Sequence, residues 1–159
     1  MYGRRISGGL LCSAIAVLLS ISVSAQTITI NNNLLFGNVF PGIPKTVTKY
    51  TAGAAAEFLV TGTAGSEISM DFTLPTYMNQ GGFNMQMIFS ETDCSFDARA
   101  TPSQSAPEHD NQDPWSTLYD QLGSSGLTIW LGGTIVPKLY QKSGAYSASI
   151  VLTVAYTGS

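Results

Sequence analysis

The sequence predicts an all-β fold, an antiparallel β-sandwich of immunoglobulin-like size with about seven to nine short strands and one short helix in a long loop. Apolar and polar residues alternate in several segments, as in strands that bury one face. Glycine, with 16 residues, marks turns between these segments. Helical spacing occurs in one short segment, and no tandem repeat is present.

The first 25 residues predict a secretory signal peptide. Arg4 and Arg5 precede an apolar stretch over 10–23, and small residues lead to Ala25. The stretch is shorter than the roughly 20 residues that a membrane-spanning helix needs. We therefore expect secretion to the periplasm, cell surface or medium, with cleavage after Ala25 and no stable membrane anchor afterwards.

The expected mature chain is acidic and forms one domain. It keeps five Lys and Arg against 10 Asp and Glu, a net charge of about −5, which argues against nucleic acid as a partner. Its length of about 134 residues is typical of a single domain. Cys94 is its one cysteine, so an intrachain disulfide is impossible. We expect Cys94 to be a small buried or half-buried thiol, and the alternative is an intermolecular bridge.

The mature chain starts with a predicted extended arm, 26–33, ahead of the sandwich domain, 34–159. Ile28 and Ile30 lie on one face of this arm, and three asparagines end it.

The first half of the domain predicts five strands. Two of them, 34–42 and 45–50, flank a Pro-Gly turn, and 54–62 is the third. The segments 67–74 and 83–90 alternate most regularly, and Gly81 and Gly82 lie in the loop between them, so we expect these two to form a hairpin.

Residues 91–126 predict a long polar excursion with one short helix over 113–123. Asp113 is suited to the N-cap and Pro114 to the first helical position, while Gly123 follows the end. Trp115, Leu118, Tyr119 and Leu122 have helical spacing.

The chain then predicts strands at 127–133, 134–140 and 144–156. The terminal strand is the most regular in the sequence, and its alternate residues predict either the last core row of a closed sandwich or an edge that another chain covers. This row contains Tyr146, Ala148, Ile150, Leu152, Val154 and Tyr156.

Trp130 is the candidate for a surface contact. It shares a face with Thr128, opposite the apolar face of the 127–133 strand. On a wet face it would stack on a sugar or dock a protein. The alternative is that a loop covers it.

The sequence predicts no catalytic site, cofactor or metal. His109 is the sole histidine, and its neighbours Glu108, Asp110 and Asp113 lack the spacing of a zinc or calcium site. No G-x-S-x-G motif or phosphate-binding glycine loop is present. We expect a solvated acidic loop here.

Three stretches, in this order, resemble the DUF4402 family of secreted bacterial proteins: LLFGNVFPG, AEFLVTGTAGSEISMDFTLP and LTIWLGGTIVPKLYQKSGAYSASIVLTVAY. The match spans most of 34–157. Its positions here are Phe36-Gly37, Val60-Thr61-Gly62, Leu74-Pro75, Gly132-Gly133-Thr134, Gly144 with Tyr146, and Tyr156.

The resemblance implies a sandwich similar to spore-coat-U and chaperone-usher pilin domains of Gram-negative bacteria. Such domains assemble when one subunit lends a strand to the next. We therefore expect a non-enzymatic, fimbria-like surface subunit that pairs with copies of itself or with a periplasmic chaperone. The expected assembly residues are Ile28, Ile30, Tyr146, Ile150, Leu152, Val154 and Tyr156. The alternative is a monomeric surface module that binds carbohydrate or protein through Trp130 and the 91–126 loop.

Overall fold

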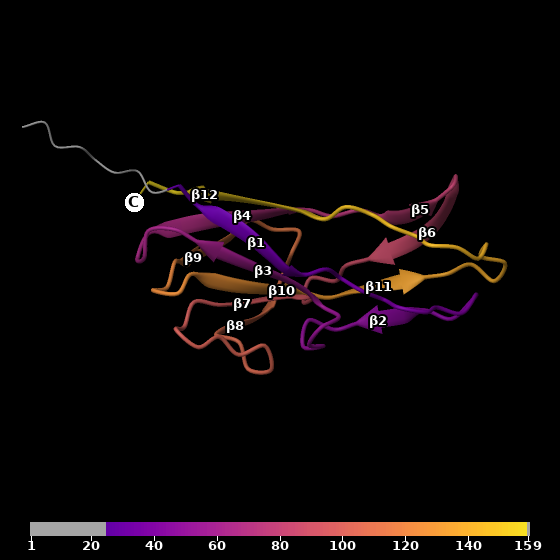
Figure 1. The fold of residues 1–159 in the computed structure, drawn as a ribbon, viewed down its shortest axis with the longest axis horizontal. Helices are drawn as coiled ribbons and strands as arrows, with labels where there is room; N and C mark the ends of the chain where they lie inside the picture. Colours follow the sequence, from indigo (N-terminus) through magenta and orange to yellow (C-terminus); the bar gives the residue numbers. More distant parts are fainter. Residues whose placement is uncertain (1–24, 159) are drawn as a thin grey trace, which may run out of the picture.

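A computed structural model describes residues 25–158 as a β-sandwich-like fold (Figure 1). The all-β prediction is confirmed, and the described residues contain no helix. Nearly all of the predicted signal peptide lies outside them. The strands outnumber the predicted seven to nine: β1 (Thr27–Asn32), β2 (Lys45–Val47), β3 (Ala56–Thr61), β4 (Glu67–Thr73), β5 (Tyr77–Gln80), β6 (Phe83–Ile88), β7 (Cys94–Asp97), β8 (His109–Gln112), β9 (Leu118–Gln121), β10 (Leu127–Leu131), β11 (Gly133–Val136) and β12 (Val151–Tyr156).

The strands form three sheets in which all neighbours are antiparallel. Their orders are β1-β3-β10-β7-β8, β2-β11-β6-β5 and β12-β4-β9. The five-stranded and three-stranded sheets pack face to face, because the rings of Phe58 on β3 and Phe72 on β4 meet edge-on at 5.9 Å. The four-stranded sheet forms the other end of the elongated molecule (Figure 1).

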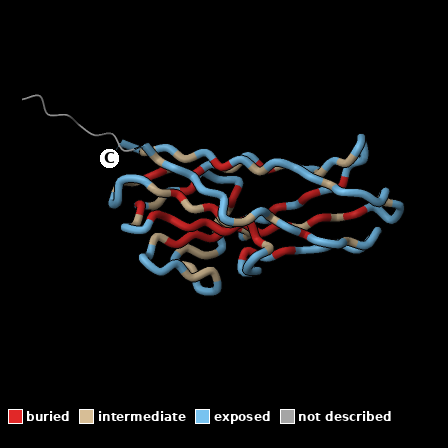
Figure 2. Tube along the Cα trace, in the orientation of Figure 1, coloured by how far each residue is buried: buried red, intermediate tan, exposed pale blue. Residues whose placement is uncertain are grey.

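The core follows the alternation of the strands. On β3, Ala56, Phe58 and Val60 are buried, and the residues between them are half-buried. All five residues of β10 are buried, so this central strand is covered on both faces. The buried apolar side chains form one cluster through the middle of the molecule (Figure 2).

Gly132 carries the chain from β10 in one sheet to β11 in another. A Cβ atom at this position would lie 2.6 Å from the carbonyl oxygen of Val47 and 2.7 Å from the amide of Lys49. Only glycine permits such a close approach between two backbones. The turn that follows β2 is thereby held against the end of β10.

The predicted strand at 34–42 is wrong, and the one at 45–50 is reduced to Lys45–Val47. Pro41 and Pro44 have no amide hydrogen to donate to a neighbouring strand. Gly37 and Gly42 have φ values of 60° and 73°, which are incompatible with extended chain.

The predicted hairpin between 67–74 and 83–90 is also wrong, although both segments are strands. β4 pairs with β12 and β9, whereas β6 pairs with β11 and with β5, which lies in the predicted loop. Gly81 and Gly82, at φ 53° and 87°, make the tight turn between β5 and β6. Pro75 interrupts the chain between β4 and β5, so the two strands belong to different sheets.

The predicted helix at 113–123 is replaced by a turn and the strand β9. Asp113 accepts hydrogen bonds from the amide of Trp115 at 2.9 Å and the hydroxyl of Ser116 at 2.8 Å, so it caps a turn. Leu118 and Leu122 are both buried, because a spacing of four residues fits a strand face as well as a helix face. Pairing with β4 decides between the two.

The terminal strand covers 151–156, shorter than predicted. Upstream of it, Ser147 and Asn79 exchange two backbone hydrogen bonds of 2.9 and 3.2 Å. The alternation itself is confirmed from Leu152, which is buried, through Val154 and Tyr156, which are half-buried.

Cys94 is a buried free thiol, as predicted. Burial raises its pKa to about 12, so it is unsuited to act as a nucleophile.

Candidate functional site

On one side of the sandwich, a side chain of β8 approaches a side chain of β9. Nε2 of His109 lies 3.7 Å from Oδ2 of Asp120, which joins the five-stranded sheet to the three-stranded one. Desolvation by burial raises the pKa of Asp120. On the opposite side, β1 and β12 are both edge strands.

The core-facing side of β1 is largely uncovered. Ile28 pairs with Val60 and Ile30 with Phe58, and the side chains of directly paired residues share a face of the sheet. Val60 and Phe58 are 0% and 5% exposed, yet Ile28 and Ile30 are 38% and 60% exposed. The predicted arm is therefore a strand, β1, at the edge of this chain's own five-stranded sheet. The three-stranded sheet that packs against this sheet leaves β1 largely uncovered.

The outer edge of β12 carries free main-chain groups. The amide of Thr157 donates to the carbonyl of Glu67 at 3.1 Å. Antiparallel pairs alternate, so the odd-numbered residues of β12 bond to β4 and the even-numbered ones point their N–H and C=O groups away from it. No strand of residues 25–158 pairs with that outer edge.

We name the space between these two edges the open seam; it is bordered by Ile28 and Ile30 on β1 and by Leu152, Val154 and Tyr156 on β12. The Tyr156 hydroxyl accepts a hydrogen bond of 2.8 Å from the amide of Thr63, just after β3. This bond ties the end of β12 to the sheet that contains β1. Both strands reach the same end of the molecule (Figure 1).

Two predicted assembly residues lie outside β12. Ile150 is half-buried just before β12, and the half-buried Tyr146 accepts a hydrogen bond of 2.6 Å from Gln141. Tyr146 lines a groove of about 810 Å³ between the segments 34–41 and 141–146, with Met78, Met85 and Ile135 among its other lining residues. This groove was not predicted from the sequence, although the apolar composition of 34–40 was a signal for it.

The predicted surface contact at Trp130 is wrong, because this side chain is 3% exposed. Its indole N–H donates to Oε2 of Glu57 at 3.2 Å. The pocket that Trp130 helps to line, of about 420 Å³, is also bordered by Arg99 and Gln104 of the polar excursion. The alternative expectation, that Trp130 is covered, is therefore confirmed.

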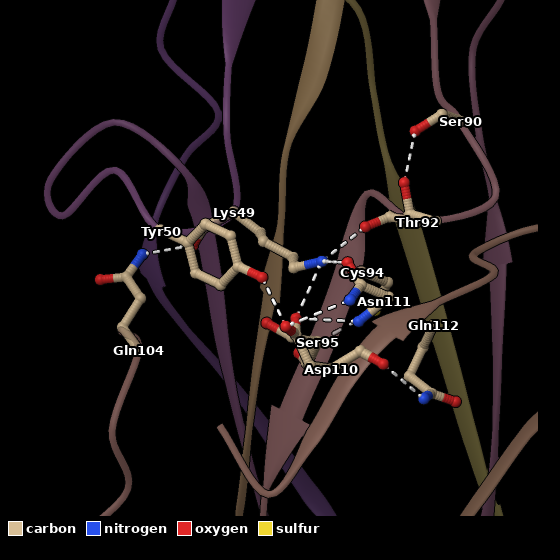
Figure 3. Close-up of polar contacts among 10 residues, drawn as sticks. All are labelled: Lys49, Tyr50, Ser90, Thr92, Cys94, Ser95, Gln104, Asp110, Asn111 and Gln112. Atoms are coloured by element: carbon tan, nitrogen blue, oxygen red, sulfur yellow. Dashed lines mark hydrogen bonds and ion pairs between the residues drawn. The ribbon is translucent and has the colours of Figure 1, made fainter. Parts of the chain in front are cut away.

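A polar cluster around Lys49 was also not predicted from the sequence. Asp110 and Asn111, expected in a solvated loop, both contact its ammonium group (Figure 3). His109 stacks on Phe96 at 4.8 Å between ring centroids. Residues 25–158 contain no group of three His, Cys, Asp or Glu side chains able to hold a metal ion.

Comparison with protein-family models, with curated proteins and with solved structures gave no match. The resemblance to DUF4402 therefore stays a prediction. Within 25–158 there is no helix with the length and apolar character needed to cross a membrane.

Proposed function

We propose that the chain is a secreted, non-enzymatic structural subunit of a Gram-negative cell surface, an immunoglobulin-like, fimbria-like sandwich that assembles by strand addition at the open seam. The observation that carries this proposal is the exposure of Ile28 and Ile30 on the core-facing side of β1. A strand laid along β12 would cover them and bond to the free main-chain groups of the even-numbered residues.

The sequence of both edges supports a second copy as the occupant. Edge strands of monomeric proteins are usually protected by Lys, Pro or inward-pointing charges. β1 (TITINN) and β12 (VLTVAY) contain none of these. The edge strands of two copies are therefore uncharged and able to pair with each other. Covering the exposed parts of Ile28 and Ile30 contributes about 2 kcal/mol, in addition to the backbone hydrogen bonds.

The burial of Trp130 leaves the alternative, a binding module that uses this side chain, with less support than assembly.

The test compares purified 26–159 with the double variant Ile28→Ser/Ile30→Ser by light scattering after size exclusion. We expect multimers of the starting protein and monomers of the variant. Both side chains are partly exposed, so the variant should lose some stability but remain folded, which circular dichroism checks. Ile88→Ser is the matched control, since Ile88 is 44% exposed on β6, away from the seam, and it should keep the multimers.

Starting protein that remains monomeric at high concentration would contradict self-assembly. Multimers that persist in the double variant would show that the seam is not the interface.

A further inference from the structure

Lys49 is a buried lysine whose ammonium group meets three acceptors. Its side chain is 4% exposed, and Nζ lies 2.6 Å from the carbonyl oxygen of Thr92, 2.8 Å from Oδ1 of Asn111 and 2.9 Å from Oδ1 of Asp110. The lysine and its three acceptors come from three separate segments and converge on one point (Figure 3). A lysine amine therefore lies in contact with a side-chain carboxamide, the acyl group that an amine attacks to form a new amide.

A β-bulge brings the carboxamide and the carboxylate to Lys49 together. Cys94 pairs with Gln112 and Phe96 with His109, so Asp110 and Asn111 are both opposite the single residue Ser95. Asn111 has φ 54°, the one positive value among the described non-glycine residues. Asparagine tolerates this left-handed conformation, which redirects the chain at the bulge.

We propose that Lys49 and Asn111 are joined by an intramolecular amide bond, with Asp110 as the proton-transfer group. Nζ of Lys49 forms a bond to Cγ of Asn111, the bond from Cγ to Nδ2 breaks, and Nδ2 leaves as ammonia. The reaction needs no oxidant, reductant or cofactor, because one amine and one carboxamide give one secondary amide and one ammonia.

Asp110 contacts both nitrogens that exchange protons. Its Oδ1 is 2.9 Å from Nζ of Lys49, and its Oδ2 is 3.3 Å from Nδ2 of Asn111. The carboxylate can take a proton from the ammonium, which leaves a neutral amine, and pass this proton to the departing nitrogen. The attacking nitrogen loses a second proton as the amide forms, and the carboxylate takes this proton and releases it to solvent. The Tyr50 hydroxyl donates to Oδ2 at 2.6 Å and holds the carboxylate in place.

The charge state of Asp110 agrees with this role. Desolvation raises its pKa, but hydrogen bonds from Tyr50 and Lys49 outweigh that effect and keep the pKa below its ordinary value. Asp110 is therefore a carboxylate before the reaction.

The surroundings favour the reaction in one direction. Lys49 is buried, and its hydrogen bond to the carbonyl oxygen of Thr92 holds the side chain in place. Its amine is therefore already positioned beside the carboxamide before the reaction. Asn111 is exposed, so ammonia can leave to solvent. The product would link the turn after β2 to β8 and restrict the unfolded chain as a disulfide does, in a protein whose described part has one cysteine.

The test is the intact mass of purified, folded 26–159. We expect it to be about 17 Da below the sequence mass, the mass of ammonia, and we expect a digest to contain one branched peptide joining Lys49 to Asn111. Lys49→Met and Asn111→Ala should each have the full mass calculated for their sequence. Asp110→Ala, which keeps both reacting groups, should also have its full mass if Asp110 transfers the protons.

Lys45→Met is the matched control. Lys45 is an exposed lysine at the start of β2, and its Nζ donates to the carbonyl oxygen of Asn38 at 3.1 Å, so the loss of about 17 Da should persist.

Folded starting protein at its full sequence mass would overturn the proposal, whatever the variants do. A loss of about 18 Da, with the branch at Asp110, would overturn the assignment to Asn111. If the Asp110→Ala variant folds and still loses ammonia, Asp110 does not transfer the protons.

Discussion

At the scale of single residues, Asp97 is the one buried carboxylate in residues 25–158. The Arg99 guanidinium binds it through Nε at 2.8 Å and through Nη2, and the amides of Arg99 and Ser103 donate to it at 2.9 and 3.0 Å. The bond to Arg99 is the largest influence on its pKa, which is lowered despite desolvation. Asp97 therefore ties the start of the 98–108 loop to β7.

We predict that Asp97→Asn destabilises the protein by about 2–3 kcal/mol at pH 7, because Arg99 and two amides lose a charged acceptor. A lowered folded pKa contributes stability above the unfolded value of about 4 and loses it as the pH falls toward the folded value. The difference in the free energy of unfolding between the variant and the starting protein should therefore be smaller at pH 3 than at pH 7. Urea unfolding at the two pH values measures this.

Asp71→Asn is the control for the loss of one charge. Asp71 is exposed and accepts a hydrogen bond from the Thr117 hydroxyl, so this variant should lose less than about 1 kcal/mol. A difference at Asp97 that does not change with pH would show that its charge is not the source of the stability.

At the scale of elements, the β5–β6 hairpin depends on its two glycines. Gly81 and Gly82 both have positive φ, the geometry of a two-residue hairpin turn that matches the twist of the strands. A Cβ atom at either position would meet nothing within 4 Å. The effect of a substitution there on stability therefore depends on the backbone conformation alone.

We predict opposite results for two substitutions at Gly81. Gly81→Val should cost about 1–2 kcal/mol, because a β-branched residue is strained at φ 53°. Gly81→Asn should change stability by less than about 0.5 kcal/mol, since Asn-Gly is a preferred pair for this turn. Guanidinium unfolding of both variants tests this, and equal midpoints would contradict it.

At the scale of the whole molecule, the two sides of the sandwich differ. One has the contact between His109 and Asp120, while the other is the open seam. If pairing is confined to the open seam, each copy meets its neighbour in a defined orientation, as an ordered assembly requires.

We predict that Val154→Pro weakens self-assembly about tenfold while the monomer stays folded. The Val154 amide points away from β4, so proline removes a donor to an added strand but no bond within the sheet. One lost hydrogen bond of about 1.4 kcal/mol corresponds to that factor. The dissociation constant from sedimentation equilibrium measures it.

Val154→Ala is the matched control, because it shortens the side chain and keeps the amide, so it should assemble more tightly than the proline variant. Equal dissociation constants for the two would mean that the outer edge of β12 does not pair.

The sequence by itself determined the all-β class and the core-facing rows of β4, β6, β10 and the end of β12. Alternation is a local property, since each strand must bury every second side chain whichever strand lies beside it. A buried Cys94 also followed from residue type. The terminal row Leu152, Val154 and Tyr156 was identified because its period is unambiguous.

Only the tertiary structure decided which strands pair, which ends stay open and which side chains meet. Leu118 and Leu122 fit a helix and a strand equally, and pairing with β4 selected the strand. Trp130 is buried because a distant loop covers its face, and Lys49 meets Asn111, 62 residues away, through a bulge. Such contacts form between residues far apart in the chain, so the local alternation of apolar and polar residues does not predict them.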